Sequence, residues 1–189
     1  MPVIIETRNL RKAYGGATAV RDVSLSVNEG EFLSLLGASG SGKTTLLRMI
    51  AGLEQPTSGQ VIYGGKDITD LPAAQRNMRM VFQDFALFPN LTVRENLAFG
   101  LRLRIYRGRV SEQDITARVG KYLETVQLSA HADKLPHQLS GGQKQRVSLA
   151  RALVTDPPVV LFDEPLGSLD ANMRKAMQIE LKRLHRDLR

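Results

Sequence analysis

A glycine-rich segment ending in Lys-Thr constrains this 189-residue chain more than any other feature. It fits the phosphate-loop pattern G-x-x-x-x-G-K-[ST] and consists of Gly37, Ala38, Ser39, Gly40, Ser41, Gly42, Lys43 and Thr44. An apolar run at residues 32–36 precedes it, and we predict a buried strand there after a hairpin turn at residues 28–30. A helix-compatible run at residues 44–51 follows, with Gly52 as its expected C-cap. In this context backbone N–H groups at a helix N-terminus converge on phosphate oxygens, whereas a chance Gly/Ser-rich turn lacks such flanks. The sequence therefore predicts a nucleoside triphosphate site lined by this loop and Thr45.

Four side chains have the chemistry that such a site requires. Lys43 is expected to reach the β- and γ-phosphates, and the Thr44 hydroxyl to ligate Mg²⁺. Asp163 and Glu164 end an apolar strand at residues 159–162, which we predict to be fully buried, and ligands bind at such strand ends in open α/β folds. We expect Asp163 to hold Mg²⁺, directly or through water, and Glu164 to act as general base on the attacking water. The alternative is an acidic pair in a strand-to-helix turn.

A second glycine-rich helix start lies upstream of that strand and is called the signature segment below. It consists of Leu139, Ser140, Gly141, Gly142 and Gln143. Its N–H groups and the Ser140 hydroxyl suit a γ-phosphate, whereas a merely flexible loop that caps a helix is the alternative.

Together these three motifs resemble the nucleotide-binding subunit of an ATP-binding cassette (ABC) transporter. The resemblance implies an α/β fold: a P-loop NTPase core with a mainly parallel, RecA-like sheet, an N-terminal antiparallel β subdomain and an α-helical subdomain. We expect residues 1–87 and 154–189 to form the β subdomain and core, and residues 88–153 the helical signature subdomain, in which Ser111, with Asp114 three residues later, is predicted from the sequence as a helix N-cap. It also implies that two cassettes pack head to tail, with each signature segment closing over the partner's ATP.

Further site residues follow from the resemblance. Tyr14 stands where the family stacks an aromatic ring on adenine, although a tyrosine beside a Gly-Gly turn also packs structurally. Gln83 resembles the glutamine that contacts Mg²⁺ and the attacking water, and Asp170 belongs to a loop along the dimer seam. Residues 85–96 resemble the face that receives a helix of the membrane subunit. Exposed Phe85, Leu87 and Phe88 would supply the socket for that helix; the alternative is that they belong to the core of the subdomain.

The same resemblance suggests the cellular role. Residues 56–59, 67–69 and 81–100 look like those of bacterial import cassettes for sugars, polyamines, iron or sulfate. The implied partners are a second copy of the chain and transmembrane permease subunits, with membrane contact only through the permease at the cytoplasmic face. Substrate choice would lie with the other subunits. The lack of cysteine fits a reducing cytoplasm.

A net charge of +7 raises the alternative of an ABC-type ATPase that acts on nucleic acid or the ribosome. The basic residues are scattered through helical stretches, and residues 43–163 hold no sustained heptads. Nucleic acid is therefore the less favoured partner.

One departure from the family pattern concerns histidine. The family has a γ-phosphate histidine after the strand that follows the Asp170 helix, whereas His131, His137 and His185 stand elsewhere. We expect the chain to be the N-terminal portion of a longer cassette that lacks the last core strands. An ATP-binding fragment with little turnover is thus an alternative to a transport ATPase.

Overall fold

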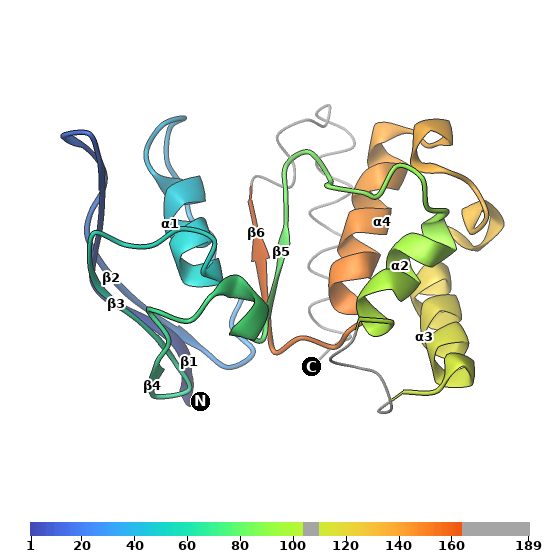
Figure 1. Cartoon of the computed structure of the whole chain (residues 1–189), viewed down its shortest axis with the longest axis horizontal. Coiled ribbons are helices and arrows are strands. Elements are labelled where there is room, and N and C mark those ends of the chain that lie inside the picture. The colour runs from blue at the N-terminus through green and yellow to red at the C-terminus, as the bar shows by residue number, and fades with distance from the viewer. Residues whose placement is uncertain (104–109, 164–189) are drawn as a thin grey trace. The chain divides into compact units, whose positions relative to one another are not determined.

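The computed structural model describes residues 1–103 and 110–163. The chain divides into two compact units, one formed by Met1–Met78 and the other beginning at Arg79. Each unit is described by itself (Figure 1).

The first unit is built on an antiparallel sheet of order β2-β1-β3-β4. Its strands are β1 (Val3–Tyr14), β2 (Ala17–Asn28), β3 (Ser58–Tyr63) and β4 (Lys66–Asp67). Strands β1 and β2 form a long hairpin that turns at Gly15 and Gly16, whose φ angles of 50° and 94° suit a two-residue turn. The predicted antiparallel β subdomain is confirmed.

Two local predictions for this unit were wrong. A hairpin turn expected at residues 28–30 does not join two strands, because the second strand expected there, at residues 32–36, is not assigned as a strand. Phe32, Leu33 and Leu36 are 48%, 45% and 92% exposed. An apolar run indicates only that a segment favours burial. Whether the segment is buried depends on neighbours that come from elsewhere in the chain.

Helix α1 (Lys43–Ala51) follows the phosphate loop and begins within one residue of its predicted start. Leu46, Met49 and Ile50 are buried on one side of it, which is the helical spacing of an amphipathic face. Gly52 ends the helix with a left-handed φ of 75°, as the sequence predicts.

The second unit combines two strands with a cluster of helices. Strands β5 (Met78–Val81) and β6 (Val159–Phe162) pair, and their arrows run in the same direction (Figure 1). The helices are α2 (Val93–Leu101), α3 (Glu112–Thr125) and α4 (Gly141–Leu153), with the short 3₁₀ helices η3 (Ser129–His131) and η4 (Pro136–Gln138) between the last two. Strand β6 is half-buried, whereas the sequence predicted a fully buried strand.

Reciprocal side-chain caps begin all three α-helices that the structure describes in this unit. Thr92 pairs with Glu95 at α2, Ser111 with Asp114 at α3, and Ser140 with Gln143 at α4. Such a capping box satisfies helix N–H groups that have no partner inside the helix. The cap predicted at Ser111 is confirmed. Across the described ranges, no helix has the length and apolarity needed to cross a membrane.

Candidate nucleotide site

The phosphate loop of the first unit is closed by its own lysine. The Lys43 Nζ donates to the carbonyl oxygens of Gly37 and Ala38, each at 2.9 Å. The Ser41 N–H donates to the Ala38 carbonyl at 3.2 Å and tightens the turn between them. The ammonium group therefore lies across the loop, where an arriving phosphate would replace carbonyl oxygens with stronger, charged acceptors.

Two glycines of the loop lie close to neighbouring atoms, and at Gly42 the neighbour is fixed backbone. A Cβ at Gly42 would lie 2.3 Å from the Ala19 carbonyl oxygen, and one at Gly37 would lie 2.6 Å from the Ser41 Oγ. Gly42 also has a φ of 88°, which L-residues with a Cβ rarely adopt. Glycine is thus required at position 42, where the loop packs against β2. The segment is therefore more than a flexible turn.

The electrostatics of α1 favour an anion at its start. Its N-cap is Gly42, no side chain caps the helix, and no acidic residue lies in the first turn. The positive end of the helix dipole is therefore not neutralised by a carboxylate there. Thr44 and Thr45, in the first turn, are half-buried. This helix start has the properties of a phosphate site.

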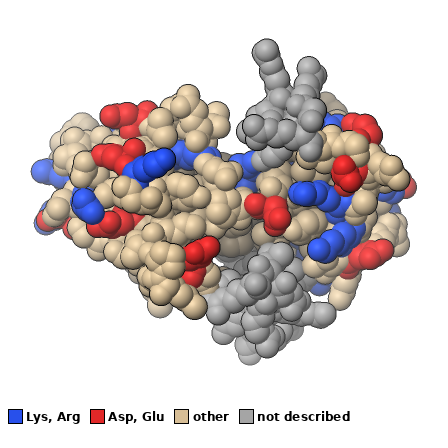
Figure 2. Space-filling view, turned by 90° about the horizontal axis from the view of Figure 1, so that it is seen from below, with Lys and Arg blue, Asp and Glu red and all other residues tan. Residues whose placement is uncertain are grey.

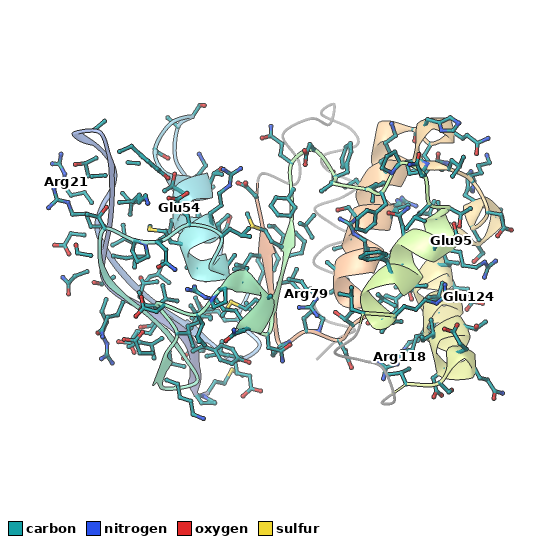
Figure 3. All side chains as sticks on the ribbon, viewed as in Figure 1. Arg21, Glu54, Arg79, Glu95, Arg118 and Glu124 are labelled. Carbon is teal, nitrogen blue, oxygen red and sulfur yellow. The ribbon has the colours of Figure 1, made fainter. Side chains whose placement is uncertain are left out.

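Tyr14 is the last residue of β1 in the first unit. It pairs with Ala17 beside the hairpin turn, and Gly42 packs against Ala19 two residues further along β2. The Lys12 ammonium lies 4.9 Å from the ring centroid and pairs with Glu54, which follows α1 (Figure 3). Tyr14 is 47% exposed, so part of its ring surface remains for a planar ligand to stack on.

In the second unit, two predicted residues meet at neighbouring strand ends. The Asp163 N–H donates to the Val81 carbonyl at 2.9 Å, and Gln83 follows two residues after Val81. Asp163 is 5% exposed, whereas Gln83 is exposed. The structure thus brings a buried carboxylate and an exposed amide to the same edge of the β5–β6 pair.

The signature segment begins α4 as the sequence predicts. Ser140 is the N-cap: its Oγ accepts from the Gln143 N–H at 3.3 Å, while the Gln143 Oε1 accepts from the Ser140 N–H at 3.0 Å. Ser140 and Gly141 are exposed. Since the Ser140 oxygen accepts this bond, its own O–H remains a donor suited to an anion.

The predicted Mg²⁺ ligands suit that ion chemically. Thr44, Gln83 and Asp163 offer a hydroxyl, an amide and a carboxylate oxygen, and Mg²⁺ prefers oxygen ligands. Within residues 1–103 and 110–163, no three His, Cys, Asp or Glu side chains form a metal cage. Mg²⁺ is usually bound by one or two carboxylates together with substrate phosphates, so a single carboxylate and a hydroxyl fit it.

The predicted site residues are divided between the two units. Tyr14 and the loop belong to the first unit, whereas Gln83, the signature segment and Asp163 belong to the second. Glu164 and Asp170 lie outside the described residues.

The predicted socket is only partly exposed. Phe88 is 37% exposed and packs on Phe99, itself 40% exposed, with ring centroids 4.3 Å apart. Phe85 and Leu87 are half-buried, which corrects the expectation that they are exposed. The reason is that the Phe85 backbone is held against α4, where its carbonyl accepts from the Ser148 Oγ at 2.9 Å.

Sequence reasoning missed two residues that support the site. Arg76 is 3% exposed and its guanidinium donates to the carbonyls of Met49 and Ile50 near the end of α1. His131 contacts Gln143 of the signature segment. No spacing rule points to either residue, because each acts through a contact between segments remote in sequence.

The comparisons with known proteins agree with this geometry. Residues 20–167 match the family model for the ABC transporter domain. The chain is 53% identical over 184 residues to the sulfate/thiosulfate import ATP-binding protein CysA of Nitrosomonas europaea, covering 97% of this chain and 51% of that protein. It is 52% identical over 185 residues to the spermidine/putrescine import ATP-binding protein PotA of Aggregatibacter actinomycetemcomitans, covering 98% and 49%. The chain thus spans about half the length of these curated relatives.

Solved structures give the same result. The ATP-binding cassette MJ0796, in a dimeric post-hydrolysis state bound to ADP and Pi, is 36% identical with a TM-score of 0.84, covering 97% of this chain and 84% of that one. CbiO1 of Clostridium perfringens, part of the ABC transporter complex cbiONQ, is 28% identical with a TM-score of 0.86, covering 100% and 76%. The phosphate loop, the capped signature helix and these similarities together establish that the chain belongs to the ABC transporter family.

Proposed function

We propose that this chain binds ATP with Mg²⁺ and hydrolyses it as the nucleotide-binding subunit of an ABC importer. The observation that carries the proposal is the phosphate loop, in which Lys43 spans the carbonyls of Gly37 and Ala38 beside an uncapped helix start. A triphosphate at this position gains the Lys43 charge and the helix dipole together. Tyr14 would stack on the adenine ring.

Hydrolysis requires groups from the second unit. In the proposal Glu164 accepts a proton from the attacking water, Gln83 orients that water, and Asp163 together with Thr44 holds Mg²⁺. The ion, when bound, neutralises charge that develops on the phosphate oxygens. Positioning and charge stabilisation supply most of the rate in such a site.

A head-to-tail dimer would complete each site. The signature segment offers an exposed Ser140 hydroxyl at the start of α4, a second anion-binding helix end. In the proposal this end meets the γ-phosphate of ATP held by the partner's phosphate loop, so two chains share two ATP molecules. Asp170 would lie along the seam between them.

The proposed role in import rests on the relatives, whose names describe sulfate/thiosulfate and spermidine/putrescine import. The exposed Phe88–Phe99 pair is the surface we assign to a permease helix, because exposed aromatic pairs mark protein contacts. The chain would then work at the cytoplasmic face of the membrane, held there by the permease.

The test is the Mg-ATP hydrolysis rate as a function of the chain's own concentration, with nucleotide binding measured in parallel. Specific activity that rises with concentration supports a site shared by two chains. Binding without turnover at every concentration would favour the ATP-binding fragment instead, and absence of nucleotide binding would contradict the whole proposal.

The nucleic-acid alternative is tested by salt dependence. Lys and Arg side chains of the described residues are interspersed with Asp and Glu over the face seen in Figure 2. Phosphate-backbone binding would instead require a basic surface and would weaken steeply with salt. RNA or DNA binding that falls steeply between low and physiological salt would revive this alternative.

A further inference from the structure

His131 lies against the signature segment at its last residue. Its Nε2 is 3.0 Å from the Gln143 Nε2, and the imidazole reaches that amide from η3, twelve residues earlier in the chain. The contact is independent of any bound ligand, and neither the family motif nor the proposed chemistry uses it. It joins η3, within the α3–α4 connection, to the residue that closes the cap of α4.

The orientation of the Gln143 amide follows from its other partner. The Ser140 N–H is a donor, so the atom facing it at 3.0 Å must be the Gln143 Oε1. The amide NH₂ group then points to His131. A flipped amide would place two donors face to face at Ser140 and lose that bond.

The tautomer of His131 follows in turn. Because the Gln143 NH₂ group only donates, the His131 Nε2 must accept, and the proton of the neutral ring must sit on Nδ1. Nδ1 is buried and has no hydrogen-bond partner among the described residues. The opposite tautomer would leave Nδ1 equally unpaired and would also lose the bond to Gln143, so the contact with Gln143 decides which tautomer is present.

We propose that His131 is a positioning residue for the signature segment: its Nε2 fixes the Gln143 side chain so that the cap with Ser140 stays closed. The proposal rests on the proposed function, because it assigns the cap the task of meeting the partner's ATP. A closed cap holds the Ser140 hydroxyl and the first turn of α4 in place before the partner arrives. Loss of the His131 bond lets the Gln143 amide turn away and loosens both reciprocal bonds.

Two matched variants test this without any nucleotide. In His131→Gln the amide oxygen can take the place of Nε2, whereas His131→Met has a similar length and no comparable acceptor. Hydrogen exchange of the Gln143 N–H should accelerate about fivefold in His131→Met and stay near the parent rate in His131→Gln. Equal exchange in all three proteins, or equal acceleration in both variants, would overturn the proposal, since the second result indicates packing alone.

The tautomer gives an independent spectroscopic readout. Long-range ¹H–¹⁵N correlations of the His131 ring in the full chain should show a protonated Nδ1 and an unprotonated Nε2. The reverse assignment would contradict the argument directly. Exposed His137, in η4, serves as the control histidine whose replacement by Met should leave the Gln143 exchange rate unchanged.

The functional readout separates this proposal from the one on which it rests. In Mg-ATP, His131→Met should need about fivefold more protein to reach half-maximal specific activity, with unchanged nucleotide affinity of the single chain. His131→Gln should recover most of that loss, and failure to do so would count against positioning. If the parent chain binds no nucleotide, the proposed function fails, while exchange and tautomer still decide the role of His131.

Discussion

Replacing Arg76 with methionine should destabilise the first unit severely, because one buried guanidinium serves four backbone carbonyls. The Arg76 Nη1 donates to Met49 and Ile50, Nη2 to Thr69, and Nε to Leu71, all at 2.7–2.8 Å. Two of these acceptors are among the last carbonyls of α1, which lack partners inside the helix. Burial lowers the pKa of Arg76, so its positive charge carries a desolvation cost that these bonds offset.

The magnitude follows from the environment of each bond. The bonds to Met49 and Ile50 are buried, whereas those to Leu71 and Thr69 are partly buried, where water replaces some of the loss. The Met49 carbonyl also keeps the bond from the Gly52 N–H. At about 1.5–3 kcal/mol for each charged hydrogen bond, with two counted in full, we expect a loss of roughly 3–6 kcal/mol in the free energy of unfolding.

The assay is urea-induced unfolding followed by circular dichroism, with thermal melts alongside. A loss of this size should lower Tm by roughly 10 °C for a chain of this length. Arg76→Lys should recover only part of it, because one ammonium cannot reach acceptors on several sides. Arg8→Met is the control, since exposed Arg8 pairs only with its neighbour Glu6 among the partners that the structure shows. If Arg76→Met unfolds at the same urea concentration as Arg8→Met, the reasoning is refuted.

Three further predictions concern the site and the caps. Lys43→Ala should weaken nucleotide binding at least tenfold in a fluorescent-ATP titration, because the charge across the loop is lost; unchanged affinity would contradict the role of the loop. Glu164→Gln should keep ATP binding and accumulate an ATP-bound dimer on size exclusion, and hydrolysis at the parent rate would show that another group is the base. Glu95 (Figure 3) tests pH: the backbone N–H of Thr92, followed by its hydroxyl, lowers the pKa of Glu95 from its ordinary 4.5. Its stabilising contribution is therefore full above about pH 4.5 and is lost as the pH falls through the lowered pKa, so Glu95→Gln should flatten the acid limb of a plot of Tm against pH.

The features that sequence predicted well are those whose cause is local. Gly52 ends α1 and Ser111 begins α3, because a left-handed φ and a side-chain cap depend on a few neighbouring residues. The phosphate loop is equally local, and two of its glycines, Gly37 and Gly42, have close contacts with neighbouring atoms. The predicted roles of these residues in binding and hydrolysis stay predictions until they are measured.

The features that sequence could not predict depend on partners far along the chain. Residues 32–36 have the composition of a buried strand, but burial is decided by what covers them. The local sequence does not distinguish Arg76 from the other arginines, because its carbonyl partners come from α1 and from the turn after β4. The hairpin at Gly15 and Gly16 is an intermediate case. A Gly-Gly pair is a local signal for a turn, but it predicts a hairpin only when the strands on both sides of it are assigned correctly.

The backbone conformation of the segment after Gln83 depends both on its own residues and on a helix far along the chain. Phe85 and Ala86 have φ angles of 64° and 47°, and residues other than glycine persist in that region only when their surroundings hold them. Arg151 of α4 supplies that restraint, donating to the Ala86 carbonyl at 2.7 Å and to the Phe85 carbonyl at 3.3 Å. Its guanidinium also lies 5.4 Å from the Phe88 ring centroid. Because Ser140 caps the start of α4 and Arg151 lies near its end, one helix carries the signature cap and also holds the strained residues after Gln83. A displacement of α4 therefore cannot leave that segment unchanged, since the bonds that maintain its strain come from the helix itself.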